Sequence, residues 1–326
     1  MRKVYSIGTA TLDIFFTFDN LNFFYDQKYL KEKNEAKSCF VDIGGGGLNF
    51  AYVFKKLGLK TQAIVKIGDD FVGKIIKKKV QEKNIPCNFV LTKGKSTLSF
   101  IFLDKKGNKY IFTYRGQEIF KEKDIQIDSD AAYYIAPGKT SINVWNKIIK
   151  KLKNKDNIVG INPSSFFLTQ DFNIVKQILN EVDFLVLNVE EMKLFISNKI
   201  KINKDKIDIN LIKTFRKLIF MPKVIIITAG FKGSWILFRE NIYFSEAYHK
   251  FKVIDTTGAG DSYGSTLFGF MVKKDFNIDE NYLKKIAKYA SINTASNLTK
   301  IGSQTGILSE SHLKKFKYSK IKILKI

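Results

Sequence analysis

The chain of 326 residues is 45% hydrophobic, enough for a large core, which excludes general disorder; its two cysteines and two histidines cannot build a disulfide framework or a histidine-based metal site. No uncharged apolar run reaches the roughly 18 residues of a membrane span, and the N-terminus lacks the pattern of a cleavable leader, so we expect a cytoplasmic protein with no membrane partner. The formal net charge of +24 comes mainly from lysines spread along the chain, with only four arginines, a pattern that does not favour a dedicated nucleic-acid-binding surface.

The first third of the chain combines regular β–α alternation with a segment that interrupts it. The hydrophobic pattern predicts, in chain order, a strand at 4–8, a helix at 47–58, a strand at 61–68, a helix at 69–84 and a strand at 87–92. Residues 97–116 alternate on both sides of Lys-Lys-Gly-Asn at 105–108, which is typical of a β-hairpin. We expect this hairpin and the Phe-rich segment 14–40 to form a small inserted β lid, built from about 11–40 and 93–118.

The rest of the chain returns to the alternation. We expect strands at 131–137, 157–164, 184–188 and 223–230, helices near 141–153, 171–181 and 189–197, a hairpin of 234–238 with 242–247, and helices at about 261–274 and 279–300. The run KVIIITAG at 223–230 is apolar and β-branched, as is typical of a strand buried on both faces of a parallel sheet. The whole pattern predicts one α/β domain over 1–326, a doubly wound and mostly parallel sheet with helices on both faces.

The loop VIDTTGAGDSYGS at 253–265 stands between a strand-like and a helix-like segment. The chain contains no G-x-x-x-x-G-K-[ST] phosphate loop. The loop nearly matches the dinucleotide-binding fingerprint, but Tyr263 stands where its last glycine is needed, and the Asp261 carboxylate would repel a resting pyrophosphate. These two departures argue against dinucleotide binding.

The same loop is suited to phosphoryl transfer. The backbone N–H groups of Gly258, Ala259 and Gly260, at the start of a helix, can converge on an anion. The Asp261 carboxylate could then take the proton of a hydroxyl group that attacks the phosphoryl group. Taken alone, the loop is equally compatible with an Asp261 that only caps the helix.

Four further motifs lie along the chain in a fixed order. They are Gly8-x-x-x-x-Asp13, IGGGGLNFAYVFKKLG at 43–58, Asn188-Val-Glu-Glu191 and Thr228-Ala-Gly230-Phe-Lys-Gly233. Together with DTTGAGD at 255–261, they closely resemble the motifs of the ribokinase-like (PfkB-type) carbohydrate kinases, over almost the whole chain. The resemblance implies a ribokinase-like fold, ATP and Mg²⁺ as cofactors, and a sugar or sugar-like substrate.

The resemblance also implies a set of substrate-binding and catalytic residues. Sugar hydroxyls would be held by Asp13, Gly45, Gly46 and Asn49. Many ribokinases have lysine where this chain has Gly46, which puts ribose itself in doubt as the substrate. Gly258, Ala259 and Gly260 would form the anion hole, and Asp261 would be the base.

The nucleotide and metal residues follow from the same resemblance. Asn188 and Glu191 would organise Mg²⁺ through waters, although an ordinary acidic helix start would also explain them. Thr228, Gly230 and Gly233 would line the nucleotide site. The family's nucleotide-wall asparagine falls by spacing at Ser291, with Asn293 two residues further on.

Two assignments are weaker. Asp255 and the carbonyl of Thr257 resemble the cation site of potassium-activated members, so K⁺ is a candidate third cofactor. Arg115, at the end of the lid hairpin, could reach a substrate or could equally be a charge on the lid surface.

The sequence therefore predicts an ATP- and Mg²⁺-dependent kinase that phosphorylates a hydroxyl group of a sugar-like substrate. One alternative is an adenosine-type nucleoside kinase, in which the lid aromatics Phe15, Phe16, Phe18, Phe23 and Phe24 stack on a base, although lid packing explains them equally well. Another is a catalytically idle, basic nucleic-acid-binding protein on the same fold. Pairing of two copies through the lid would make a homodimer.

Overall fold

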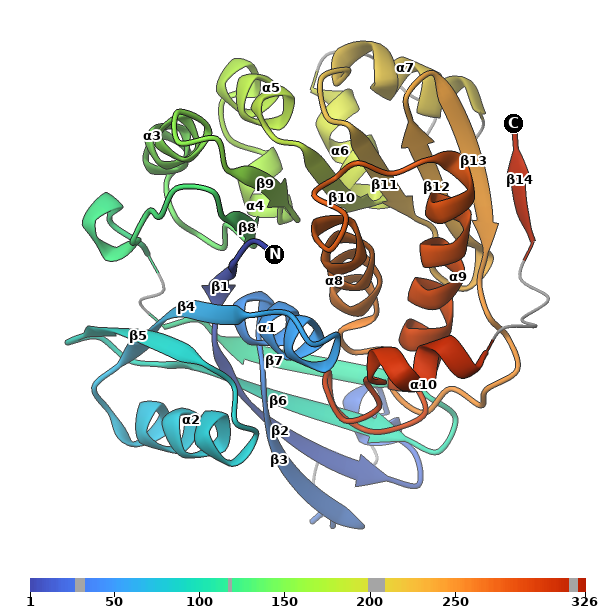
Figure 1. Ribbon diagram of the computed structural model, residues 1–326. Helices are drawn as coiled ribbons and strands as arrows, with labels where there is room; N and C mark the ends of the chain where they lie inside the picture. Colours follow the sequence, from blue (N-terminus) through green and yellow to red (C-terminus); the bar gives the residue numbers. More distant parts are fainter. Residues whose placement is uncertain (27–32, 117–118, 199–208, 317–321) are drawn as a thin grey trace.

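The computed structural model describes residues 1–26, 33–116, 119–198, 209–316 and 322–326. The predicted lid positions at 27–32 and 117–118 lie outside the described residues. Two sheets organise the described chain: a ten-stranded sheet in the order β14-β13-β12-β11-β10-β9-β8-β1-β4-β5, and a four-stranded sheet in the order β3-β2-β6-β7. The first is the body of the molecule and the second is the lid (Figure 1).

Seven neighbouring strands of the body sheet pair in parallel, from β5 to β11, and the last three pair antiparallel. In spatial order the parallel strands are β5 (Cys87–Thr92), β4 (Thr61–Gly68), β1 (Val4–Thr9), β8 (Ala132–Ile135), β9 (Ile158–Ile161), β10 (Phe184–Asn188) and β11 (Val224–Thr228). The antiparallel strands are β12 (Gly233–Phe238), β13 (Asn241–Glu246) and β14 (Ile323–Lys325). The predicted doubly wound, mostly parallel sheet is confirmed.

Helices cover both faces of the body sheet (Figure 1). One face carries α1 (Gly46–Lys56), α2 (Phe71–Glu82), α8 (Ala259–Val272) and α9 (Glu280–Asn297), with α10 (Glu310–Lys315) packed on α9. The other carries α3 (Ile142–Lys153), α4 (Ser165–Leu168), α5 (Phe172–Glu181), α6 (Val189–Ser197) and α7 (Ile209–Leu218). The centre of the first face is aromatic: Tyr134 on β8 packs against Phe50, Phe54 and Phe268. Its core is therefore built from residues far apart in sequence.

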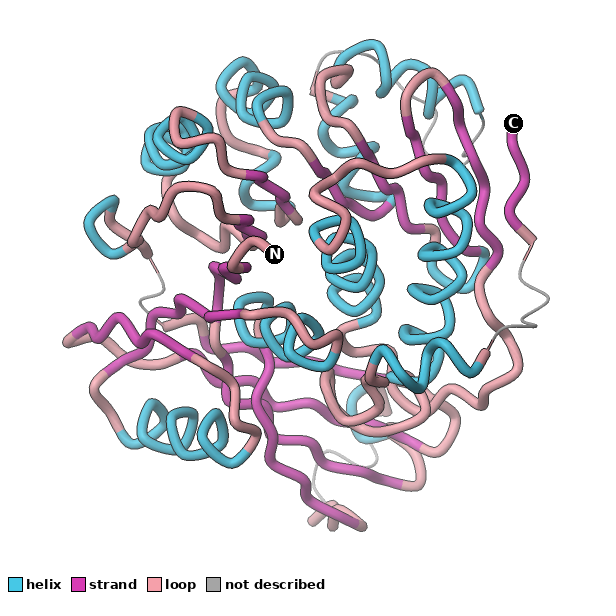
Figure 2. Tube along the Cα trace, viewed as in Figure 1, coloured by secondary structure: helices cyan, strands magenta, loops and turns pink. Residues whose placement is uncertain are grey.

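The lid is a small twisted sheet of two antiparallel pairs joined by a parallel one. It consists of β2 (Thr11–Phe18), β3 (Ser38–Gly44), β6 (Thr97–Asp104) and β7 (Lys109–Tyr114), and β2 pairs in parallel with β6. The predicted hairpin turn is present, and Gly107 takes a positive φ of 84° there. The strands of the lid lie together at the bottom of the view in Figure 2. The two cysteines differ: Cys39 on β3 is exposed, whereas burial raises the pKa of the Cys87 thiol on β5 to about 12.

The two faces of the lid have different surroundings. Side chains alternate along a strand, so Asp13 and Phe15 share one face of β2, while Phe16 and Phe18 point to the other. Phe15 packs with Ile101 and Leu103 against Ile301 of the body. Phe16 and Phe18 instead join a cluster around Phe102 that also includes Phe23 and Phe24. Four of the five aromatics considered for base stacking therefore pack among themselves, away from the Asp13 face.

Candidate active site

The glycine-rich loop ends on the first turn of α8, as predicted. Gly258 is the residue before the helix and has a left-handed φ of 75°, and a Cβ there would meet the side chain of Ser303. A Cβ on Gly260 would instead meet no atom within 4 Å. Gly258 is therefore required by the backbone itself, whereas the bare backbone at Gly260 leaves space in front of the helix N-terminus. That space is where an anion would approach the N–H groups.

Asp261 lies in the first turn of α8 and is partly buried. The Asn49 amide, on α1, donates a hydrogen bond of 2.7 Å from Nδ2 to Asp261 Oδ2. Loss of solvent around the carboxylate raises the Asp261 pKa, and the Asn49 hydrogen bond opposes that rise. No described residue donates a hydrogen bond to Oδ1. This oxygen can therefore accept a proton from a substrate.

Asn49 is fixed by a chain of polar contacts. Its Oδ1 accepts hydrogen bonds from Ser303 Oγ at 2.8 Å and Gln304 Nε2 at 3.0 Å, so its NH₂ group must face Asp261. Lys83 Nζ, at the end of α2, donates to Gln304 Oε1 at 3.1 Å and to Asp42 Oδ2 at 2.8 Å. These hydrogen bonds connect Asn49 to the lid, where Asp42 lies on β3. Ser303, Gln304, Asp42 and Lys83 were not predicted, because no motif singles them out.

Asp13 lies on the body-facing side of the lid, directly opposite Asp42 on the neighbouring strand. Its side chain is almost wholly buried, at 6% exposed. Burial raises the Asp13 pKa to about 7; a hydrogen bond from Ser99 opposes the shift, and the negative charges of Asp42 and Asp255 add to it. The structure therefore brings the predicted sugar-binding carboxylate close to the DTTGAGD loop.

A polar cavity of about 260 Å³ gathers most of the predicted catalytic and metal residues. It is lined by Asn162, Val186, Leu187, Asn188, Glu191, Thr228, Thr256, Gly258, Ala259, Gly260 and Asp261. These residues come from the ends of three parallel strands, from the first turn of α6, and from the start of α8 with the loop before it. Ligands of open α/β sheets bind at this carboxyl edge of the strands.

Asn188 and Glu191 form a reciprocal cap at the start of α6. Asn188 Oδ1 accepts from the Glu191 N–H, and Glu191 Oε2 accepts from the Asn188 N–H, both at 2.8 Å. Burial raises the Glu191 pKa to about 7, with the charge of Asp261 contributing. The cap explains their spacing, and their position in the polar cavity leaves both able to approach a phosphate-bound metal ion.

A second cavity, of about 340 Å³ and mostly apolar, adjoins the first. Both cavities are lined by Thr228, Thr256, Ala259 and Gly260. The predicted nucleotide residues Gly230, Gly233 and Ser291 line the apolar one, together with Phe231, Tyr248 and His249, which sequence reasoning missed. An apolar pocket beside a helix N-terminus suits a ligand with one apolar end and one anionic end.

The structure does not bring Asn293 into this cavity. Asn293 is fully buried; its Nδ2 donates to Thr266 Oγ1 and its Oδ1 accepts from the Leu308 N–H, both at 2.8 Å. Its amide therefore ties α9 to α8 and to the chain before α10. Of the two alternatives read from the spacing, Ser291 lines the cavity and Asn293 does not, because residues two apart on a helix point to nearly opposite sides.

The remaining predicted residues lie around the substrate side. Gly45 immediately precedes α1, and the Gly46 N–H donates to Thr9 Oγ1 at 3.2 Å. A Cβ on Gly46 would meet Ala136, so this glycine allows close packing of α1 on the sheet. Arg115 follows β7 and is exposed at the base of the lid.

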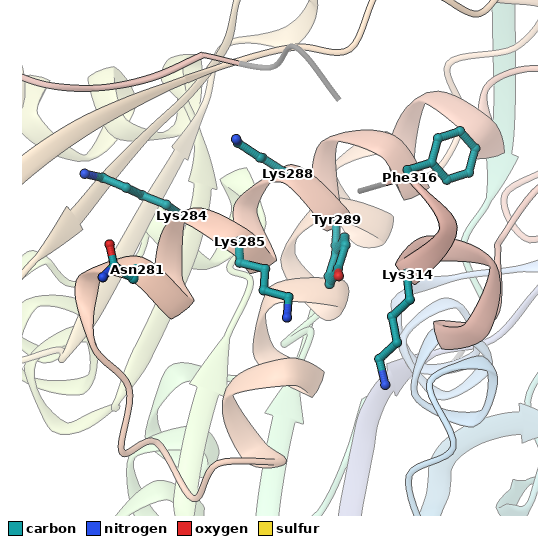
Figure 3. A pocket seen from close by; sticks show the side chains of 7 residues that line it. All are labelled: Asn281, Lys284, Lys285, Lys288, Tyr289, Lys314 and Phe316. Carbon is teal, nitrogen blue, oxygen red and sulfur yellow. The ribbon is translucent and has the colours of Figure 1, made fainter. Parts of the chain in front are cut away.

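A third hollow, of about 470 Å³, lies on the outer face of α9 and α10, and Lys284, Lys285, Lys288 and Lys314 surround Tyr289 there (Figure 3). Lys284 and Lys314 are paired with Glu280 and Glu310. The hollow has none of the predicted catalytic residues in its lining.

Comparison with known proteins identifies the family. Residues 1–309 match the pfkB family of carbohydrate kinases. The chain is 28% identical over 322 residues to a ribokinase of Dictyostelium discoideum, covering 92% of this chain and 95% of that protein. The chain therefore belongs to the pfkB carbohydrate kinase family, and the prediction of a phosphotransferase that acts on hydroxyl groups is confirmed.

Solved structures confirm the ribokinase-like fold. The nucleoside kinase of Methanocaldococcus jannaschii superposes with a TM-score of 0.75 at 21% identity, covering 97% of each chain. Phosphofructokinase-2 of Escherichia coli, solved in complex with potassium, superposes with a TM-score of 0.76 at 17% identity, covering 97% of this chain and 98% of that one. Among the described helices, none has the length and apolar character needed to cross a lipid bilayer.

Proposed function

We propose that the protein transfers the γ-phosphoryl group of ATP to a hydroxyl group of a sugar or sugar-like substrate, with Mg²⁺ as the second cofactor. The observation that carries the proposal is the pair of adjoining cavities, one apolar and one polar, which meet at Ala259 and Gly260 in front of Asp261. The adenine base would occupy the apolar cavity, between Gly230, Gly233 and Ser291. The phosphates would then lie at the N-terminus of α8, where helix N–H groups favour negative charge.

In the proposed reaction Asp261 is the general base. The substrate hydroxyl oxygen attacks the γ-phosphorus, the bond from that phosphorus to the β–γ bridging oxygen breaks, and ADP leaves. The hydroxyl proton passes to Asp261 Oδ1, while Asn49 holds Oδ2 in place. The N–H groups of Gly258, Ala259 and Gly260 stabilise the negative charge on the transferring group.

Magnesium would be held by Asn188 and Glu191 through water molecules and by the phosphates of the nucleotide. Within the described residues, no group of three or more His, Cys, Asp or Glu side chains could hold a metal ion by itself. This fits Mg²⁺, which usually keeps several waters and binds one or two carboxylates together with substrate phosphates. When bound, the ion supplies positive charge that offsets the charge of the phosphates.

Asp13, Asn49, Gly45 and Gly46 are proposed to hold the acceptor, with Arg115 at the edge of its site. Asp13 is suited to this role because its buried carboxylate can accept two hydroxyl hydrogen bonds once substrate enters. The named relatives include both ribokinase and nucleoside kinase, so a nucleoside is the second candidate acceptor.

A homodimer through the lid is also proposed. The edge strand β7 exposes Tyr110, Ile111, Phe112 and Tyr114, an apolar strip on a strand whose outer edge is unpaired within the described sheet. Such edges favour pairing with another chain. Sedimentation of the wild type and of Ile111→Lys would test this, and a monomeric wild type would overturn it.

The experiment that tests the main proposal is ADP release measured against a panel of sugars and nucleosides. We expect turnover with at least one acceptor, lost in Asp261→Asn, while the variant still binds ATP in calorimetry. An idle, nucleic-acid-binding protein would show no turnover with any acceptor and a steep salt dependence of RNA or DNA binding.

A further inference from the structure

The carboxylate of Asp255, six residues before the proposed base, is completely buried. Its Oδ1 accepts hydrogen bonds from the Thr257 N–H at 2.9 Å and Thr257 Oγ1 at 2.6 Å. Its Oδ2 accepts from the Gly302 N–H at 3.0 Å. These contacts fix the carboxylate at the start of the loop that forms the proposed anion hole. A carboxylate this deeply buried requires a positive charge nearby.

In this chain a lysine of the lid supplies that charge. Lys109 is the first residue of β7, and its Nζ lies 3.6 Å from Asp255 Oδ1. The same ammonium group donates to Thr256 Oγ1 at 3.0 Å and Thr257 Oγ1 at 3.2 Å. Within the described residues, Lys109 is the only basic side chain paired with Asp255.

The ammonium group therefore stands where the family resemblance would put a monovalent cation. A potassium ion bound by Asp255 and the Thr257 carbonyl would share this carboxylate with Lys109 Nζ. The two positive charges would then lie on one carboxylate, and like charges repel strongly in a buried site. Three of the acceptor positions of the carboxylate are already used by N–H and O–H donors. The residues as arranged do not fit a potassium ion in addition to Lys109.

We propose that the ε-ammonium group of Lys109 replaces the monovalent cation beside Asp255, so that this kinase needs no K⁺. The inference rests on the proposed kinase function and concerns the same loop. The charge neutralises Asp255, three residues before Gly258, and so keeps the backbone of the proposed anion hole in place. Because Lys109 belongs to the lid, the positive charge reaches the loop only when the lid tip is docked on the body.

The first test compares wild-type turnover in tetramethylammonium chloride and in potassium chloride at equal ionic strength. We expect rates within about twofold of each other. A rate that is ten or more times higher in potassium would overturn the proposal.

The second test uses Lys109→Gln, with Lys106→Gln as the matched control. Lys106 is an exposed lysine of the same hairpin turn, where its charge acts on Asp104. We expect Lys109→Gln to lose at least tenfold in turnover without potassium and to recover most of it when potassium is added, because the ion can then bind the vacated position. Lys106→Gln should behave as wild type in both salts. Loss of turnover that potassium does not restore would overturn the assigned role.

A thermal-unfolding measurement separates this inference from the kinase assignment, since it needs no substrate. We expect the melting temperature of Lys109→Gln to rise specifically in potassium, and that of the wild type to be the same in both salts. This pattern would support Lys109 as the resident cation even if no acceptor were phosphorylated. A wild-type melting temperature that rises in potassium but not in tetramethylammonium would contradict it. If Lys109→Gln does not fold, Lys109→Met gives the same comparison. If neither variant folds, the melting temperatures of the wild type in the two salts decide the question.

Discussion

The two halves of the site, the body and the lid, are assembled in different ways. In the body, the proposed anion hole and base lie within four consecutive residues at one helix start, and most of the residues proposed for metal and nucleotide binding lie at or just after the ends of neighbouring strands. In the lid, Asp13 acquires its environment from Asp42 on another strand and Asp255 in the body. The proposed anion hole and base are thus adjacent in the sequence, whereas the surroundings of Asp13 depend on long-range packing.

The largest expected effect in the body half of the site is that of Asp261→Asn, which tests the proposed general base. We expect turnover to fall by about 10²–10⁴-fold, because a general base contributes roughly that factor. ATP affinity should change little, because the apolar cavity is untouched. Steady-state kinetics and calorimetry with ATP measure the two effects, and near-normal turnover would remove Asp261 from the role of base.

Gly258 and Gly260, on either side of Ala259, distinguish an effect on backbone strain from an effect on the space for a ligand. Gly260→Ala should fold as the wild type does, since its Cβ would enter open space, yet lose on the order of 10²-fold in kcat/KM because the methyl group occupies the phosphate position. Gly258→Ala should instead lower the free energy of unfolding by about 1–3 kcal/mol, since its φ is left-handed and Ser303 lies in the way. Denaturant unfolding and kinetics distinguish them; equal stability losses would contradict this division.

The polar chain from the lid to the base can be cut at Gln304. Gln304→Leu should lower turnover by roughly tenfold, because Asn49 loses one of the two donors that orient it. A weaker Asn49 bond would let the Asp261 pKa rise further, and a base works only above its pKa. The acidic limb of the pH–kcat profile should therefore move to higher pH. Gln177→Leu, at an exposed position of α5, is the control, and an unmoved limb would show that Gln304 is merely structural.

The smallest expected effect concerns the stability of the lid. Because the Asp13 pKa is raised to about 7 by burial, the folded state binds a proton more tightly than the unfolded state, and stability is lost as pH rises from about 4 to 7. Asp13→Asn should remove that loss and be more stable than the wild type at pH 8, on the order of 2 kcal/mol, with the difference shrinking by pH 5. Calorimetry over this pH range measures it; a variant less stable at pH 8 would contradict the sign.

The order of strands and helices was largely predictable, because each strand of the body is a short apolar run and each helix has an apolar stripe. β4, β5, β10 and α6 have the bounds expected from their patterns. The helix α7, which precedes β11, was missed because no motif marks it and only its apolar stripe indicates a helix. The short elements α4, α10 and β14 are too brief for a period to show.

Some residues of the candidate site could be proposed from the sequence, and others could not. Asp261 and its glycines could be proposed from the sequence because the loop suits an anion and the other motifs resemble those of one kinase family. Lys109 could not be found, since it is one lysine among many and only the folding of the hairpin onto the body brings it to Asp255. Gln304 was hidden for a similar reason: its partner Asn49 is far away in sequence. Asn293 is the converse case. Its residue type suggested a place at the nucleotide site, but its side chain lies in the core and donates to Thr266.

The two thiols differ in exposure, so the natural chain can be labelled at a single position. Cys39 is exposed on the lid strand β3, while Cys87 is partly buried on β5 with a pKa of about 12, so that little reactive thiolate forms there. A thiol-reactive fluorophore should therefore attach at Cys39 with no engineered substitution. The label would lie on the lid, and its emission would report changes in the surroundings of β3 as acceptors and salts are exchanged.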